Sequence, residues 1–97
     1  MVRPKRRRKI GFSPDVTYFK PKGVPMSILD EVDLTIDELE AVRLKYLSGN
    51  NNEQAAKKMQ ISSSTFQRII VSAMQKITDA LVNGKAIKLH NIIDFNF

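Results

Sequence analysis

The stretch from Asn51 to Leu81 constrains the fold most, because it holds two helical patterns separated by a short break. In the second pattern, apolar residues recur at three- and four-residue spacing and so share one helix face: Phe66, Ile69, Ile70, Ala73, Ile77 and Leu81. The opposite face carries short side chains that are uncharged except for one arginine: Ser64, Gln67, Arg68, Val71 and Gln75. The sequence therefore predicts one helix face for a core and one able to contact base edges.

The break between the two helices covers Met59–Ser62. Ser62 is a good N-cap, because its hydroxyl can accept from a free amide in the next helical turn. Ala55 and Ala56 on the first helix are small enough to let the second helix approach closely. Together these features predict a helix-turn-helix. An ordinary helical hairpin in an all-α core remains the alternative.

The net charge of +6 is concentrated at the N-terminus. Residues 1–23 contain eight Lys or Arg and one acid, whereas residues 24–97 contain eight Lys or Arg against nine acids. We expect residues 1–9 to form a flexible arm that follows phosphates or enters the minor groove, through Arg3, Lys5, Arg6, Arg7, Arg8 and Lys9. The alternative is a solvated tail that only aids solubility.

The composition argues against several classes of protein. A chain of 97 residues suits one small domain, and the absence of cysteine removes disulfides and thiolate metal sites. His90 is the single histidine, which argues against a histidine metal site or a Ser-His triad. No apolar run reaches membrane-spanning length and no secretory signal follows the basic start, so we expect a cytoplasmic protein without cofactor or metal.

An enzyme is not predicted either. The carboxylates that could form an acid–base pair are interpreted as a helix start and its solvated face: Asp37, Glu38 and Glu40. No glycine-rich loop that could hold a phosphate is present.

Short β-prone segments are predicted on both sides of the helices. Residues 10–25 form an extended or β segment and linker, in which we expect Tyr18 and Phe19 to lie in the core. Residues 86–90 alternate like a half-buried strand, which could pair with residues 10–12 within one chain or across two. Residues 91–97 form an apolar tail that we expect to pack on something.

The first helix is predicted to begin at a capping box formed by Thr35 and Glu38 and to end at Gly49. Its buried stripe is expected to be Leu39, Val42, Leu44 and Leu47. Asn51 and Gln54 repeat the box for a second helix that ends near Lys58, and the third helix ends near Gly84. The fold class is thus mainly α: a three-helix helix-turn-helix domain over residues 26–90, with β segments at its ends.

Three segments in order, VTYFKPKGVP, LTIDELEAVRLKYLSG and EQAAKKMQISSSTFQRIIVSAMQKITDALVNGKAI, resemble a family of small predicted DNA-binding proteins of bacteria and archaea. That family is classed as a domain of unknown function, and its helix-turn-helix is similar to region four of sigma factors. The resemblance implies a reading helix that begins at Ser63 and faces the major groove. The residues that it implicates are Ser62, Ser63, Ser64, Thr65, Gln67 and Arg68.

Two positions depart from the family pattern. Gln60 stands where the turn usually has glycine, so a residue with a Cβ is expected at positive φ, at a cost of about 1–2 kcal/mol. Asn50 stands where an apolar residue is usual, so we expect looser packing at the entry to the second helix.

The leading hypothesis is a sequence-specific regulator that binds double-stranded DNA as a homodimer. Arg68 is expected to contact guanine and Gln67 adenine. The alternative is a protein-interaction module that acts through the acidic first helix and the apolar tail. RNA binding is less supported, because no aromatic platform on a sheet is evident.

Overall fold

The computed structural model describes residues 10–11 and 17–90. Along this part of the chain the elements are β1 (Tyr18–Phe19), a 3₁₀ turn η1 (Met26–Ile28), β2 (Glu31–Thr35), α1 (Ile36–Val42), a π-helical turn η2 (Arg43–Leu47), α2 (Asn52–Met59), α3 (Ser63–Asn83) and β3 (Ala86–His90). The predicted class, mainly helical with short β segments, is confirmed. The residues of the basic arm, Phe12 and the tail at 91–97 lie outside the described residues.

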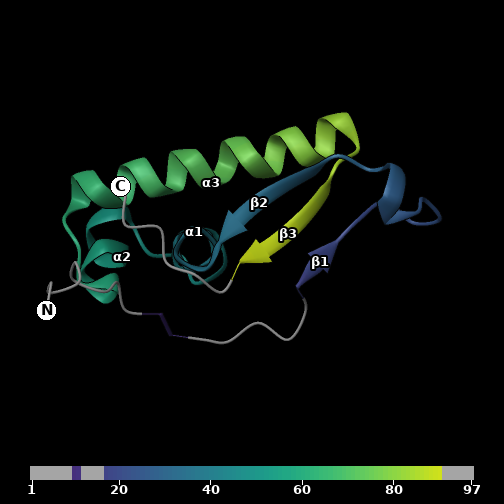
Figure 1. The fold of residues 1–97 in the computed structure, drawn as a ribbon. Helices are drawn as coiled ribbons and strands as arrows, with labels where there is room; N and C mark the ends of the chain where they lie inside the picture. Colours follow the sequence, from purple (N-terminus) through teal and green to yellow (C-terminus); the bar gives the residue numbers. More distant parts are fainter. Residues whose placement is uncertain (1–9, 12–16, 91–97) are drawn as a thin grey trace, which may run out of the picture.

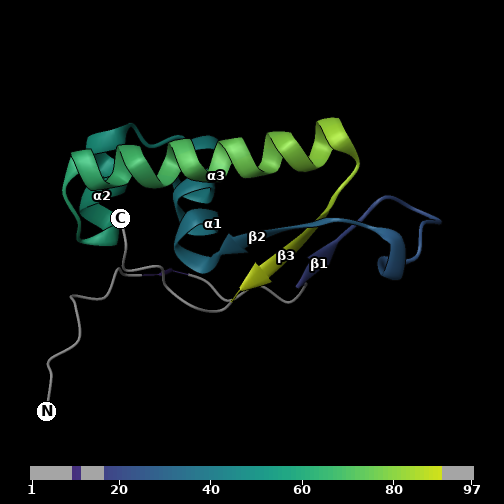
Figure 2. The same cartoon turned by 45° about the horizontal axis from the view of Figure 1, so that its top comes forward.

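The long helix α3 runs along one side of the molecule, with α2 near its N-terminal end and the sheet near its C-terminal end (Figure 1). Turning the molecule keeps this arrangement, with α1 beside α3 and between α2 and the sheet (Figure 2). The strand order is β1-β3-β2, and β3 pairs antiparallel with β1 and parallel with β2. The sheet therefore joins segments from the two ends of the described chain.

The expected partner of residues 86–90 was wrong. Strand β3 is confirmed, but both of its edges are occupied by β1 and β2, so no edge is left for residues 10–12. Ile10 instead packs against the helical core. Sequence reasoning misses β2 because its residues, EVDLT, lead directly into a capping box and so resemble the approach to a helix.

The helical core gathers around the junction of α2 and α3, where Ala55 and Ala56 are buried as the helix-turn-helix pattern predicted. Its buried residues are Ala41, Leu44, Ala55, Ala56, Met59, Phe66, Ile69 and Ile70. Leu81 was expected on this face but is 77% exposed, because α3 runs on past the core. Tyr18 and Phe19 were also expected to be buried and are exposed, since they lie on a two-residue edge strand.

The buried face of α1 differs most from expectation. Leu47 is 82% exposed and Leu39 and Val42 are only half-buried, so of the predicted stripe only Leu44 is buried. Asp37, Glu38 and Glu40, expected to be solvated, are instead buried. Compared with the orientation predicted from the sequence, α1 is rotated about its own axis so that its acidic side faces the rest of the molecule.

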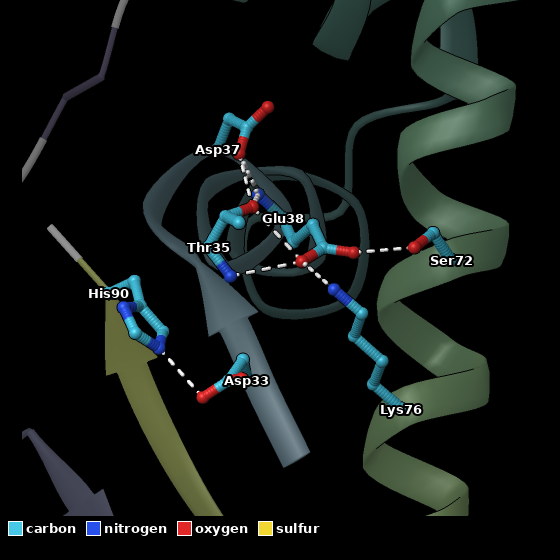
Figure 3. A network of polar contacts seen from close by, with 7 residues as sticks. All are labelled: Asp33, Thr35, Asp37, Glu38, Ser72, Lys76 and His90. Atoms are coloured by element: carbon cyan, nitrogen blue, oxygen red, sulfur yellow. Dashed lines mark hydrogen bonds and ion pairs between the residues drawn. The ribbon is translucent and has the colours of Figure 1, made fainter. Parts of the chain in front are cut away.

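Glu38 is the centre of a buried polar network between α1 and α3 (Figure 3). Its carboxylate accepts hydrogen bonds from Lys76 Nζ at 2.8 Å and from Ser72 Oγ at 2.6 Å. It also accepts from the Thr35 backbone amide at 2.9 Å, which completes the predicted capping box. These partners make burial of the charge possible, because a buried carboxylate must be paired and hydrogen-bonded.

Glu40 is held in a similar way at the other side of α1. It accepts from Arg43 Nε at 2.6 Å and from the Gly11 backbone amide at 2.6 Å. The hydrogen bond that Arg43 donates to Glu40 raises the pKa of Arg43 above its ordinary value.

The first helix was predicted to end at Gly49, but α1 ends at Val42 and the chain continues as the π-helical turn η2 to Leu47. The predicted boundaries of the other two helices hold closely. Asn51 and Gln54 form the second capping box, and α2 ends at Met59, one residue beyond the predicted Lys58. Gln60 has a φ of 59°, so the turn does place a residue with a Cβ in the left-handed region, as predicted. Asn50 fills the entry to α2 by donating from Nδ2 to the Leu44 carbonyl at 2.8 Å.

Candidate nucleic-acid interface

The start of α3 presents a polar face to solvent. Phe66 and Ile69 are completely buried and fix the rotation of the helix, so residues on its opposite side project outward. The exposed residues of this face are Ser63, Ser64, Gln67 and Arg68. The structure thus brings these four sequence-predicted residues together on the first two turns of one helix.

Two other predicted residues mainly build the helix start. Ser62 Oγ accepts from the Thr65 backbone amide at 3.1 Å, which is the N-cap bond, and donates to Thr65 Oγ1 at 2.9 Å. Ser62 Oγ also lies 3.2 Å from Ser64 Oγ. Thr65 is half-buried, so the pair orients the first turn more than it offers groups to a ligand.

Arg68 is exposed and makes no hydrogen bond or ion pair with the residues described by the structure. Lys57 and Lys58 lie exposed in the last turn of α2, close in the chain to the turn that leads into α3. The exposed acids Asp30 and Glu31 lie by contrast at the start of β2, at the opposite end of the molecule (Figure 1). Glu53, in the first turn of α2, is also exposed at the α2–α3 end, but Lys57, Lys58 and Arg68 outnumber it there. The charges of the described residues are therefore still favourable for an anion at this end.

Gln67 is joined to two residues that the sequence analysis did not single out. Asn52, the first residue of α2, donates from Nδ2 to Gln67 Oε1 at 2.6 Å. Lys45, in η2, donates from Nζ to Asn52 Oδ1 at 2.7 Å. The only sequence signal for this chain of contacts is that Asn52 directly follows the N-cap Asn51 and so is the first residue of α2.

Gln67 also lies at one end of a groove of about 470 Å³ between η2 and α3. Its apolar lining includes Tyr46, Val71 and Met74. Of these, Tyr46 is 60% and Val71 44% exposed. The groove thus continues the polar face of α3 into a more apolar surface.

The remaining predicted contacts cannot be placed on this interface. Arg3, Lys5, Arg6, Arg7, Arg8 and Lys9 all lie outside the described residues.

Sequence comparison gives the relationship of this chain to other proteins. Residues 1–92 match the family described as protein of unknown function DUF134. The chain belongs to the DUF134 family. It is 58% identical to a UPF0251 protein of Thermoanaerobacter pseudethanolicus over 89 residues. The aligned residues cover 92% of this chain and 75% of the relative. A UPF0251 protein of Caldanaerobacter subterraneus is 57% identical over 89 residues, with the same coverage of both chains. No solved structure is detectably similar.

Neither a metal cluster nor a membrane-spanning helix is found in the part of this DUF134 chain that the structure describes. Among residues 10–11 and 17–90, no group of three or more His, Cys, Asp or Glu is placed to hold a metal ion. Within the same residues, no helix is both long and apolar enough to cross a membrane.

Proposed function

We propose that this DUF134 protein is a regulator that binds double-stranded DNA sequence-specifically, with the start of α3 in the major groove. The observation that carries the proposal is the exposed polar face formed by Ser63, Ser64, Gln67 and Arg68. A groove-reading helix must be held rigidly from behind while its outer face stays free, and burial of Phe66 and Ile69 meets that need.

The relation of α2 to α3 supports the proposal. The helices are separated by three residues, Gln60 in the left-handed conformation and then Ile61 and the N-cap Ser62. Buried Ala55 and Ala56 allow α2 to lie close against α3. This is the arrangement expected of a helix-turn-helix, and we propose that it is similar to region four of sigma factors.

Individual roles follow from side-chain chemistry. Arg68 has a planar fork of donors with no internal partner in the described chain, which suits the O6 and N7 acceptors of guanine. Lys57 and Lys58 are suited to phosphates, where a point charge positions the protein without reading sequence.

The experiment that tests the proposal is selection of bound fragments from a random DNA pool, followed by affinity measurements. Arg68→Ala should cost about 1–3 kcal/mol on the selected site and much less on random DNA. Lys85→Ala, just beyond the C-terminal end of α3, is a control that should leave both affinities nearly unchanged. Equal losses for Arg68→Ala on both DNAs would show that Arg68 touches only phosphate, and a pool without enrichment would refute sequence-specific binding.

We propose further that the DNA-bound species is a homodimer, since one reading helix covers only a short stretch of bases. The supporting surface lies at the C-terminal end of α3, where Leu81 is 77% and Val82 75% exposed. Phe19, 55% exposed, shares a hollow with Leu81. Exposed apolar groups this close together are common at protein interfaces.

The same exposed residues support the alternative function, a protein-interaction module. The acids of α1 are buried, however, so the acidic contribution of such a module would come from exposed acids outside that helix, such as Asp30, Glu31 and Asp33. Recovery of a DNA-independent complex that is lost on Leu81→Asp, with DNA binding unchanged, would favour this alternative over the DNA-bound dimer.

A further inference from the structure

The chain of contacts Lys45–Asn52–Gln67 fixes which end of the Gln67 amide faces outward. An ammonium group only donates hydrogen bonds, so the Asn52 atom that faces Lys45 must be the carbonyl oxygen. Asn52 then turns its NH₂ toward Gln67 and donates to Oε1. The orientation of both amides follows from the lysine, although oxygen and nitrogen look alike in shape.

We infer that Gln67 is set by Lys45 and Asn52 to read hydrogen-bond acceptors on DNA, and that Asn52 is the positioning residue that determines this specificity. The inference rests on the proposed function of the α3 face. It changes the expectation that Gln67 contacts adenine, which was drawn from the side-chain type alone.

The chemistry of the major groove turns this orientation into a base preference. Guanine presents two acceptors, N7 and O6, and thymine presents O4, whereas cytosine presents a donor amine and adenine a donor amine beside N7. The adenine contact of a glutamine needs Oε1 to accept from N6 while Nε2 donates to N7. Oε1 keeps a second lone pair, but it is turned back toward Asn52 on α2, so Nε2 is the end of the amide that faces outward. The two hydrogens of Nε2 match guanine best and thymine next.

Three elements hold the arrangement in place. Asn52 is the first residue of α2, where the capping box of Asn51 and Gln54 fixes the backbone. Lys45 stands on η2 beside Leu44, which is buried in the core. Gln67 follows the completely buried Phe66. Side chains mounted on packed elements keep a set geometry, which is what a reading residue needs before it meets DNA.

Asn52→Asp is the decisive substitution. The new carboxylate has two acceptor oxygens, so one still accepts from Lys45 and the other can accept only from Gln67 Nε2. Gln67 must then turn Oε1 outward, and its preference should reverse from guanine or thymine to adenine or cytosine. The fold should tolerate the change, because a negative charge is favourable in the first turn of a helix.

The measurement is a binding selection with wild-type protein and with Asn52→Asp, read as base ratios at each position of the site. At the position whose preference disappears on Gln67→Ala, the wild type should favour an acceptor base by about 5- to 140-fold, the range of one good side-chain–base pairing. Asn52→Asp should invert that ratio. The added charge also repels phosphates, but it weakens binding to all sequences alike and leaves the ratio intact.

Two controls isolate the mechanism. Lys45→Met frees Asn52 to turn either way, so the preference at that position should relax without reversing. In the Asn52→Asp background, Gln67→Ala should remove the reversed preference, because no amide remains to be reoriented.

The outcomes separate this inference from the proposed function. If the wild type enriches no sequence, both the inference about Gln67 and the proposed function are refuted. If it enriches a site but Gln67→Ala changes no position, or Asn52→Asp reverses none, the inference falls and DNA binding stands. Side-chain amide NMR of the free protein gives an independent check: Gln67→Ala should shift the Asn52 NH₂ signals and speed their exchange. Unchanged Asn52 signals would overturn the inference without any DNA experiment.

Discussion

Replacing Lys76 by methionine tests the buried network that fastens α3 to α1. The substitution keeps most of the aliphatic length and removes only the charged donor. Lys76 Nζ lies 2.8 Å from a carboxylate oxygen of Glu38, whose side chain is completely buried, while the lysine side chain is 33% exposed. Glu38 would keep its bonds from Ser72 and Thr35 but lose its compensating charge.

The expected cost lies between two known limits. Removing one member of a fully buried ion pair costs about 3–5 kcal/mol, because the other charge stays buried. Exposed pairs contribute about 0–1 kcal/mol. Water can reach the lysine position here and two neutral donors remain, so we expect Lys76→Met to lower the free energy of unfolding by about 2–3 kcal/mol.

Urea unfolding followed by far-ultraviolet circular dichroism measures this loss. For a protein of this size, the midpoint should fall by about 1–2 M urea at unchanged slope. Lys85→Met is the matched control, because Lys85 forms a 2.9 Å pair with Asp79 at the surface and should shift the midpoint far less. Removing both charges, by Glu38→Met with Lys76→Met, should cost less than the sum of the two single substitutions, because no unpaired charge is left behind; the lost bonds to Ser72 and Thr35 remain a cost. Equal midpoints for Lys76→Met and Lys85→Met would refute the reasoning.

Three other predictions concern the arm, the turn and the assembly. Deleting residues 1–9 should weaken binding to all DNA sequences and flatten the log–log salt dependence by about 0.9 for each phosphate that the protein no longer neutralises; an unchanged slope would leave the arm as an aid to solubility. Gln60→Gly should raise the free energy of unfolding by about 1 kcal/mol, because glycine removes the Cβ from a φ of 59°; a loss of stability would show that the turn is not strained. Light scattering at micromolar concentration should give a dimer that Leu81→Asp converts to monomer; a monomeric wild type that binds one DNA site as one copy would defeat the dimer proposal.

Local sequence signals predicted the helices well because they act over a few residues. The boxes Thr35–Glu38 and Asn51–Gln54 join positions three residues apart, and both are present. Gly84, at a φ of 67°, ends α3 where predicted. The positive φ of Gln60 was also foreseen, but from the resemblance to a family that usually has glycine at this position.

Long-range partners were the part that the sequence could not supply. Glu38 can be buried because Lys76, 38 residues further along the chain, neutralises its charge. No residue near Glu38 in the sequence indicates that this lysine will be its partner. The same holds for the candidate site. The polar face of α3 follows from helical periodicity, whereas the bond between Asn52 and Gln67 depends on how α2 crosses α3.

The central position of β3 has a consequence for how the protein acquires its shape. Asp33 on β2 and His90 on β3 are joined at 2.7 Å although they stand 57 residues apart in the chain (Figure 3). In the strand order β1-β3-β2, neither β1 nor β2 has a strand partner among the described residues until β3 is added. The strand that closes this sheet is therefore the last of its three to be synthesised, so none of the strand pairing can form until the whole of α3 has been made. A chain truncated before Ala86 would lack only one of the three strands, β3, but would lose all the strand pairing of this sheet.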